Sequence, residues 1–492
     1  MKRRDILKLA ATSAAALTTG TARPFAASRA RAQEALDPRE KFLFVVTANG
    51  GGSMLDSFYP VIGAELKNGK SDVLTTYPES LVAQPKGSTI RCVKRMENTG
   101  IFTSAYSLET LVEKHFADMV IVPVDNTSVN HVVAQKRAIT GSGVDRGRTI
   151  MEAVAERHGA KKLIANCNMA AGGYIAPGDD PSMPDWARGE LISSPALFPL
   201  ATDSARGVAG APGRELLQRA REVRRELEAT SAFAARYAES PLRRRFVELQ
   251  GKLSSGLMDA NLISKLMVVP DADGSSLSGA LPLTPFDLES SPDGRKVWSA
   301  FPEVMTDSLH AQGALAFLLA RYGVSSVVSL GPSSRPVFLD DGRILGTPIS
   351  FDYSHVDHQS CQNIMWSRMG MLLDGLITLL KGEPLGEGTM WDRSLIYVAT
   401  DFGRGRDRPS GASQWGSVHE LNNANLFISP MLKGNRMFGG IDLETLRFHG
   451  FDRKTGEADP GVMLREADLY SLVAHAFDVE FEGRTDMRAL LR

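Results

Sequence analysis

The sequence predicts an α/β protein, and two observations carry that prediction. Short, almost continuous apolar runs alternate with segments whose apolar residues recur at helical spacing, which is typical of parallel strands buried on both faces and joined by helices. Polar clusters directly follow several of these runs, at the position where open α/β sheets place their functional sites. The predicted strands are residues 42–48, 119–124, 163–165, 324–330 and 395–400.

The chain begins with a twin-arginine pattern. Arg3 and Arg4 precede a soft apolar run at residues 7–22, which is too short and too weakly apolar to persist as a membrane-spanning helix. The Ala-Arg-Ala of residues 30–32 supplies a small-x-small cleavage site. We therefore predict a signal peptide at residues 1–32, with the twin-arginine export machinery as a partner. The mature protein is expected to be periplasmic or secreted, without a permanent transmembrane anchor.

The composition argues against several classes of protein. The 56 Lys and Arg residues balance 57 Asp and Glu residues, so no overall positive charge attracts nucleic acid, and we expect no nucleic-acid partner. Cys92, Cys167 and Cys361 are too few and too scattered for a disulfide framework or a thiolate metal site. One disulfide remains compatible with an oxidising compartment.

The predicted helices reveal a break in the middle of the chain. The clearest helix covers residues 359–381, where Leu, Ile and Met recur at helical spacing. A charged helical run at residues 214–266 lies between two loop-rich stretches and interrupts the strand and helix alternation. The predicted organisation after the signal peptide is a first part of the α/β domain at 33–171, an inserted helical and loop-rich cap at 172–302, and a second part of the α/β domain at 303–492.

Carboxylates follow the first and the last predicted strands. After residues 42–48, three consecutive glycines permit a tight turn, and Asp56 presents a carboxylate to a divalent cation. A plain turn with Asp56 as a helix cap is the alternative. Asp401 directly follows residues 395–400, and Arg404 in the same loop can hold a phosphate or sulfate oxyanion. An arginine-rich surface loop is the simpler interpretation.

A histidine follows the second predicted strand. His131 closes a polar cluster at residues 125–131, just before a helical stretch. Groups at a helix N-terminus lie where backbone donors and the helix dipole favour an anion. Capping of that helix by Thr127 or Ser128 is the alternative.

The densest set of potential metal ligands precedes the long helix. Asp352, His355, Asp357 and His358 place two carboxylates and two imidazoles within seven residues, although the chain has only nine histidines. Such oxygen and nitrogen donors suit Zn²⁺, Mn²⁺ or a similar ion. Capping of the following helix by Asp357 or His358 is the alternative.

Taken together and in this order, these features resemble a bacterial family, the domain of unknown function 1501. The resemblance rests on the twin-arginine start, the turn at residues 51–58, the Asp352 to His355 element and the Thr-Asp-Phe-Gly-Arg of residues 400–404. It covers most of the mature chain and is diffuse in the cap. The family in turn resembles the alkaline phosphatase and sulfatase superfamily. This resemblance implies a mixed, mostly parallel sheet sandwiched by helices, with a metal site at the strand ends.

The resemblance also implies residue roles, with several departures. Asn130 stands where the family commonly has Ser, which leaves Ser128, Thr127 or an activated water as the nucleophile. Phe402 replaces one ligand histidine, and Gln414 replaces another, which only the nearby His419 could compensate. We therefore expect one ion rather than two. The predicted metal ligands are Asp56, Asp352, His355 and Asp401, and the predicted catalytic residues are Ser128, His131 and Arg404.

Two functions are consistent with these features. The first is an exported hydrolase of phosphate or sulfate esters, which uses one divalent ion (Zn²⁺, Mn²⁺, Mg²⁺ or Ca²⁺) and acts on an anionic small molecule or glycan. In this hypothesis Ser128 or water attacks the ester, and Arg404 orients its oxyanion. The second is a non-catalytic periplasmic binding or assembly module that retains the fold.

Overall fold

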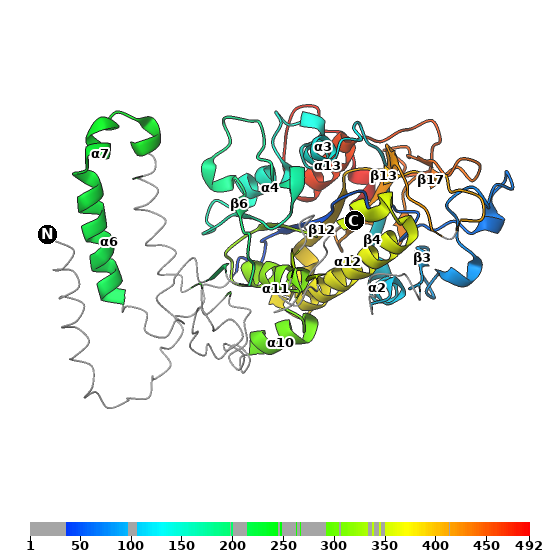
Figure 1. Cartoon of the computed structure of the whole chain (residues 1–492), viewed down its shortest axis with the longest axis horizontal. Helices are drawn as coiled ribbons and strands as arrows, with labels where there is room; N and C mark the ends of the chain where they lie inside the picture. The colour runs from blue at the N-terminus through cyan, green and yellow to red at the C-terminus, as the bar shows by residue number, and fades with distance from the viewer. Residues whose placement is uncertain are drawn as a thin grey trace. The chain divides into compact units, whose positions relative to one another are not determined.

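A central sheet of eight strands organises the chain (Figure 1). The computed structural model describes residues 36–96, 106–196, 198–199, 214–244, 247, 262, 266, 292–304, 307–332, 337–338, 344–345, 350–412 and 414–492. In spatial order, the strands are β16 (Arg436–Met437), β4 (Met119–Asp125), β15 (Asn422–Ile428), β12 (Ser394–Thr400), β1 (Phe42–Ala48), β7 (Val327–Leu330), β5 (Asn166–Asn168) and β6 (Glu190–Leu191).

The sheet is mixed and mostly parallel. β15 pairs antiparallel with both β4 and β12, whereas every other neighbouring pair is parallel. This arrangement confirms the predicted α/β fold class with a mixed, mostly parallel sheet.

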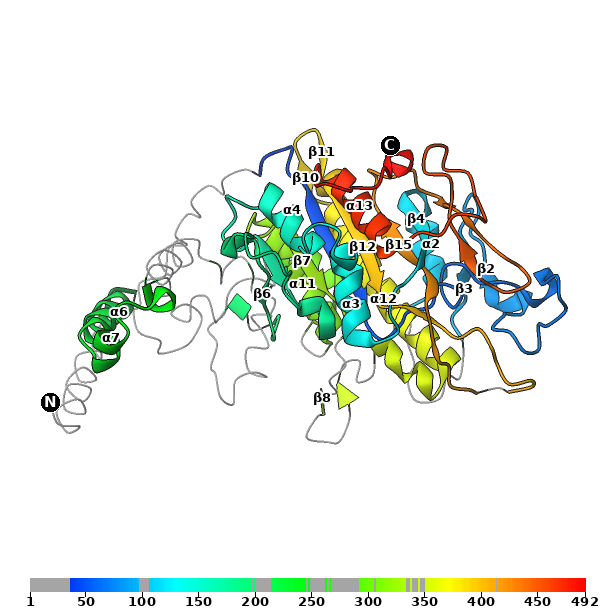
Figure 2. The same ribbon diagram turned by 90° about the horizontal axis from the view of Figure 1, so that it is seen from above.

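Helices cover both faces of the sheet, as Figures 1 and 2 show. Along β1, Phe44 and Val46 belong to one core, and Leu43 and Val45 belong to the other. Both sides of this strand are therefore removed from water, which explains its uninterrupted apolar sequence. The first core contains α2 (Leu108–His115), α10 (Pro292–Ala300), α11 (Ser308–Arg321) and α12 (His358–Lys381), and the second contains α3 (His131–Thr140), α4 (Ile150–His158) and α13 (Glu466–Ala476).

Smaller elements complete the part of the chain that the structure describes. The helices α6 (Arg214–Ala229) and α7 (Ala232–Arg236) fall within the predicted cap. The two-stranded antiparallel pairs are β2 (Val82–Ala83) with β3 (Cys92–Val93), β8 (Val337–Phe338) with β9 (Ile344–Leu345), β10 (Pro384–Leu385) with β11 (Gly388–Thr389), β13 (Gly403–Arg404) with β14 (His419–Glu420), and β17 (Gly440–Ile441) with β18 (Phe448–His449).

Most predicted strands agree with the structure. The strand predicted at 42–48 is β1, and those predicted at 119–124, 324–330 and 395–400 overlap β4, β7 and β12. The strand predicted at 163–165 was placed too early, because the strand that pairs with β7 is β5, formed by the next three residues. β15 was missed because its three asparagines interrupt the apolar pattern.

The long helix predicted at 359–381 is confirmed as α12. It begins one residue earlier, and Asp357 caps it by accepting a hydrogen bond from the Ser360 N–H at 3.2 Å. β6 shows that part of the predicted cap range 172–302 belongs to the sheet edge.

Other features of the chain bear on its compartment. The predicted signal peptide at residues 1–32 lies outside the described residues. Cys92, Cys167 and Cys361 are buried and unpaired with one another. Among the described helices, none combines the length and apolar character needed to cross a bilayer.

Candidate metal centre

Four segments that are distant in sequence meet at one edge of the sheet. Ala48 at the end of β1 pairs with Thr400 at the end of β12. Asp125 at the end of β4 pairs with Asn422 at the start of the antiparallel β15. The loops after β1, β4 and β12 and the segment before β15 therefore share this edge, where open α/β sheets place their sites.

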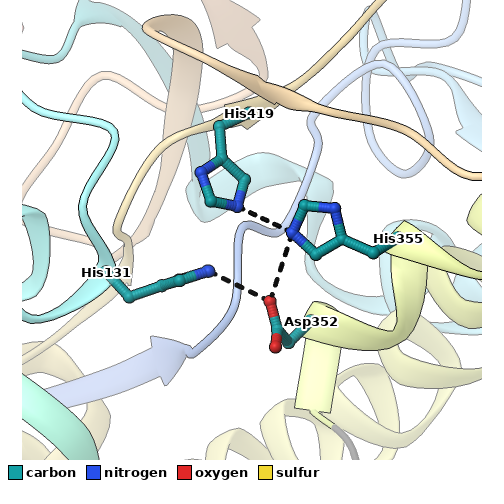
Figure 3. Close-up of side chains that lie close together, drawn as sticks. All are labelled: His131, Asp352, His355 and His419. Carbon is teal, nitrogen blue, oxygen red and sulfur yellow. Dashed lines mark hydrogen bonds and ion pairs between the residues drawn. The ribbon is translucent and has the colours of Figure 1, made fainter.

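Four side chains converge at this edge and form the His131–Asp352–His355–His419 cluster (Figure 3). One potential ligand atom from each lies within 4.8 Å of all the others. Asp352 Oδ1 is 3.0 Å from His131 Nε2 and 3.6 Å from His355 Nε2, which is 2.8 Å from His419 Nε2. Three imidazole nitrogens and one carboxylate oxygen form a donor set that suits Zn²⁺ or a similar transition-metal ion better than Mg²⁺ or Ca²⁺.

Local structure places the first and last histidines of the cluster. His131 is the first residue of α3, and the Asn130 side chain caps this helix by accepting a hydrogen bond from the Val133 N–H at 3.2 Å. His419 begins β14 and pairs directly with Arg404 of β13. Both imidazoles are thus carried by hydrogen-bonded backbone rather than by free loops.

A 3₁₀ helix at Ser350–His355 carries the other two members of the cluster. Asp352 and His355 are three residues apart, so one turn brings their side chains to the same face. The segment is anchored by the Phe351 N–H, which donates to the Asn49 carbonyl at 2.9 Å, and by the Ser417 N–H, which donates to the Ser354 carbonyl at 2.8 Å.

Two of the imidazoles are oriented by groups behind them. Asp401 Oδ2 lies 2.7 Å from His131 Nδ1, and the Val129 carbonyl lies 2.8 Å from His419 Nδ1. Such partners fix the imidazole tautomer and direct Nε2 toward the position of an ion, as they do in known metal centres. Asp401 is fully buried, and among the described residues its Oδ1 has no hydrogen-bond partner. These observations fit a site that holds one ion.

The cluster residues change one another's pKa values. Burial disfavours a charged His131, but its hydrogen bonds to Asp352 and Asp401 outweigh burial and raise its pKa to about 9. The contact with His131 lowers the pKa of Asp352 to about 2. Burial and the charge of His131 lower the pKa of His419 to about 4. In metal-free protein at pH 7, His131 is therefore protonated, and an ion would displace that proton.

Phe402 packs against two histidines of the cluster. Its side chain is fully buried, and its ring centroid lies 4.7 Å from that of His131 and 4.2 Å from that of His419. The residue that takes the place of a ligand histidine in the family resemblance therefore packs against two other histidines and restricts their rings.

Arg404 lies behind the cluster rather than at its surface. Its side chain is fully buried and donates to the Gly50 carbonyl, and to the Phe351 carbonyl at 3.2 Å. Its Nη1 is 3.2 Å from His355 Nε2, and its Nη2 is 3.5 Å from Asp352 Oδ1. Arg404 thus ties the glycine turn after β1 to the segment that carries Asp352 and His355.

The structure does not bring Asp56 to the cluster. Asp56 is buried elsewhere, with Oδ1 accepting from the Tyr77 hydroxyl at 2.6 Å and Oδ2 lying 3.1 Å from His358 Nε2. His358 Nδ1 is in turn 2.9 Å from the Ser417 hydroxyl. These groups connect the turn after β1 to the start of α12 and to the segment before β14.

The predicted residues therefore divide into three groups. Asp352, His355 and His131 lie in the cluster, and Asp401 and Arg404 stand behind it. Ser128 Oγ accepts a hydrogen bond from the Asn130 N–H at 3.1 Å and is not a member of the cluster, and Asp56 lies apart. His419 was not among the predicted ligands, although its position near Gln414 was the signal that singled it out.

Comparisons with known proteins find distant similarity among solved structures. No protein-family model and no curated protein matches the chain. Among solved structures, a phosphonate monoester hydrolase from Silicibacter pomeroyi is similar at 12% identity and a TM-score of 0.34, over 92% of this chain and 76% of that one. Ps i-CgsB, in complex with a neocarrahexaose, is similar at 11% identity and a TM-score of 0.29, over 90% of this chain and 73% of that one.

Proposed function

We propose that this protein is a metal-dependent hydrolase of phosphate or sulfate esters that uses one divalent ion, most suitably Zn²⁺. The observation that carries the proposal is the convergence of one donor atom each from His131, Asp352, His355 and His419 within 4.8 Å. When bound there, such an ion would polarise an ester oxygen and lower the pKa of a water molecule.

Exposure of the cluster favours chemistry over a purely structural ion. The Asp352 side chain is 52% exposed and that of His355 is 41% exposed, so a substrate can reach the cluster from solvent. Four protein ligands are typical of a structural zinc site, so catalysis here requires the ion to take water or substrate as a fifth ligand, as zinc does in some catalytic sites.

The charges behind the cluster favour an anionic substrate. Asp352 and Asp401 are acidic, and the buried Arg404 beside them is basic. A divalent ion would leave the centre with an excess of positive charge, which attracts a phosphate or sulfate oxyanion. Arg404 acts in this proposal by holding Asp352 and His355 in place.

Water is the better candidate for the nucleophile. The Ser128 hydroxyl accepts from the Asn130 N–H and does not join the cluster. Such a water would be made more acidic by the ion, and the half-exposed Asp352 carboxylate would accept a hydrogen bond from it.

Metal analysis of protein purified without chelator tests this proposal. We expect one zinc per chain, loss of zinc in His419→Ala, and no change in the control His449→Gln, whose imidazole lies outside the cluster. Chromogenic phosphate and sulfate esters then test turnover. Zinc without turnover of any ester would favour the binding or assembly module, and absence of zinc would exclude the metal centre.

We also propose that the protein is exported by the twin-arginine machinery, a proposal supported by Arg3 and Arg4 in the sequence. Replacement of both arginines by lysine should retain the protein in the cytoplasm, as measured by cell fractionation. Unchanged fractionation would contradict this route.

A further inference from the structure

The surroundings of the cluster are unusually apolar for an exposed site. Sixteen large hydrophobic residues among the described ones are exposed, and six of them lie within two positions of a histidine of the cluster. These six form what we call the aliphatic rim. Its members are Val129, Val132, Val133, Val356, Val418 and Leu421.

Chain geometry keeps the aliphatic rim close to the cluster. Consecutive Cα atoms are about 3.8 Å apart, so residues one or two positions from a ligand stay near it. Val132 follows His131, Val356 follows His355, and Val418 precedes His419. Because the three histidines lie on separate segments, the members of the aliphatic rim also come from three separate segments.

Charged side chains are scarce among the sequence neighbours of the cluster. Within two positions of the four cluster residues, the exposed neighbours are the aliphatic rim and Asn130, and none of them is charged. Asp357 and Glu420 also fall in this range, but both are partly buried. Asp357 accepts a hydrogen bond from the Ser360 N–H at 3.2 Å, and Glu420 forms an ion pair with Arg406 at 3.1 Å. A highly hydroxylated substrate would find few hydrogen-bond partners here.

We propose that the substrate is an amphiphile, an anionic phosphate or sulfate ester that carries an alkyl chain. The inference rests on the proposed function, because the oxyanion binds at the metal centre. The alkyl chain lies against the aliphatic rim, where its burial removes apolar surface from water on both partners. The proposal selects this class over hydrophilic glycan esters.

Ligand binding to the zinc-loaded full chain tests the inference without relying on turnover. Calorimetric titrations would use methyl-, butyl- and octylphosphonic acid and the corresponding alkylsulfonic acids, all below their micellar concentrations. We expect affinity to rise about twofold per methylene, because a rim that stays partly wet recovers part of the full burial effect.

A variant of the aliphatic rim supplies the decisive comparison. The triple variant Val132→Thr, Val356→Thr and Val418→Thr changes exposed positions to a residue of similar shape. It should bind the methyl compounds and zinc as the parent does but lose most of the dependence on chain length. Leu191→Thr, an exposed residue of β6 outside the aliphatic rim, should keep that dependence.

The outcomes separate the two proposals. Retained zinc and methylphosphonate or methylsulfonate binding with no dependence on chain length would overturn the amphiphile inference alone. A chain-length dependence that survives in the triple variant would also overturn it, because the alkyl chain would then bind away from the aliphatic rim. If the parent protein did not hold zinc, or bound no headgroup, both proposals would be overturned.

Discussion

At the scale of single residues, Asp401 illustrates how one carboxylate organises the centre. It was predicted as a ligand, but its Oδ2 contacts His131 Nδ1 at 2.7 Å and the Gly50 N–H at 3.2 Å. In the proposed centre it acts through His131, which it orients, as a positioning residue.

Replacement of Asp401 by Asn should weaken zinc binding by about 10- to 100-fold, because the imidazole of His131 loses the carboxylate that fixes its tautomer. Competition with a chromophoric chelator measures this affinity. Asp442→Asn, an exposed carboxylate near β17, should leave zinc binding unchanged. Equal zinc affinities for parent and Asp401→Asn would show that the contact is not needed for the ion.

Asp374 on α12 allows a test of pH dependence away from the metal centre. It lies 2.8 Å from both Lys114 and His115, and although burial opposes its charge, these contacts lower its pKa to about 2. A lowered pKa stabilises the fold above the unfolded pKa of about 3.9, and this stabilisation is lost as the pH falls toward 2.

Asp374→Asn should accordingly reduce the free energy of unfolding by roughly 2 kcal/mol at pH 7. The difference from the parent should shrink below pH 4 and vanish near pH 2. Urea unfolding at several pH values measures both effects. Glu113→Gln, an exposed carboxylate on α2, serves as the control. A difference that stays constant with pH would contradict the assignment.

At the scale of elements, the glycine turn after β1 decides how closely the ligand segment approaches the sheet. Gly50 has φ of 98°, and a Cβ there would lie 2.3 Å from the Asp352 backbone nitrogen. The left-handed conformation and the close contact both require glycine. The turn therefore supports Asp352 without providing a ligand itself.

Gly50→Ala should destabilise the protein by at least about 2 kcal/mol and reduce its zinc content, because the strain and the clash move the segment that carries Asp352. Gly69→Ala isolates the conformational contribution, since Gly69 also has positive φ, 67°, but nothing lies within 4 Å of its Cβ position. Urea unfolding combined with metal analysis distinguishes the two variants. Equal losses of stability and zinc in both variants would show that the close contact between residue 50 and Asp352 does not matter for either.

At the scale of the whole molecule, the ion would join segments from distant parts of the chain. His131 follows β4, His355 precedes α12, and His419 begins β14. Binding to these folded positions, and not to the unfolded chain, stabilises the native state by mass action.

Zinc at about 100 times its Kd should stabilise the fold by about 2.7 kcal/mol, and chelation should remove that gain. Thermal unfolding with zinc and with EDTA measures the shift in Tm. His131→Ala should show no such shift, because it removes one member of the cluster. Identical Tm values for the parent under both conditions would argue against a metal that links these segments.

The fold class, most of the central strands and the chemistry available at the strand ends could be predicted from the amino-acid sequence. Uninterrupted apolar runs such as 42–48 identify buried strands, because this signal is contained within a few neighbouring residues. Asp352, His355 and Asp401 stood out for the same reason, as polar groups placed directly beside such elements. β15 did not stand out, because its buried asparagines form hydrogen bonds that only the folded chain supplies, such as the one from Asn425 to the Tyr397 hydroxyl at 3.1 Å.

Which of these groups meet could not be predicted, because their contacts form only in the folded chain. His419 enters the cluster because β14 pairs with β13, and Asp56 stays out because His358 and Tyr77 hold it in a buried network of its own. Such contacts join residues that are tens to hundreds of positions apart. They depend on strand order and register, which are set by the packing of the whole sheet and leave no trace in the local pattern of residues.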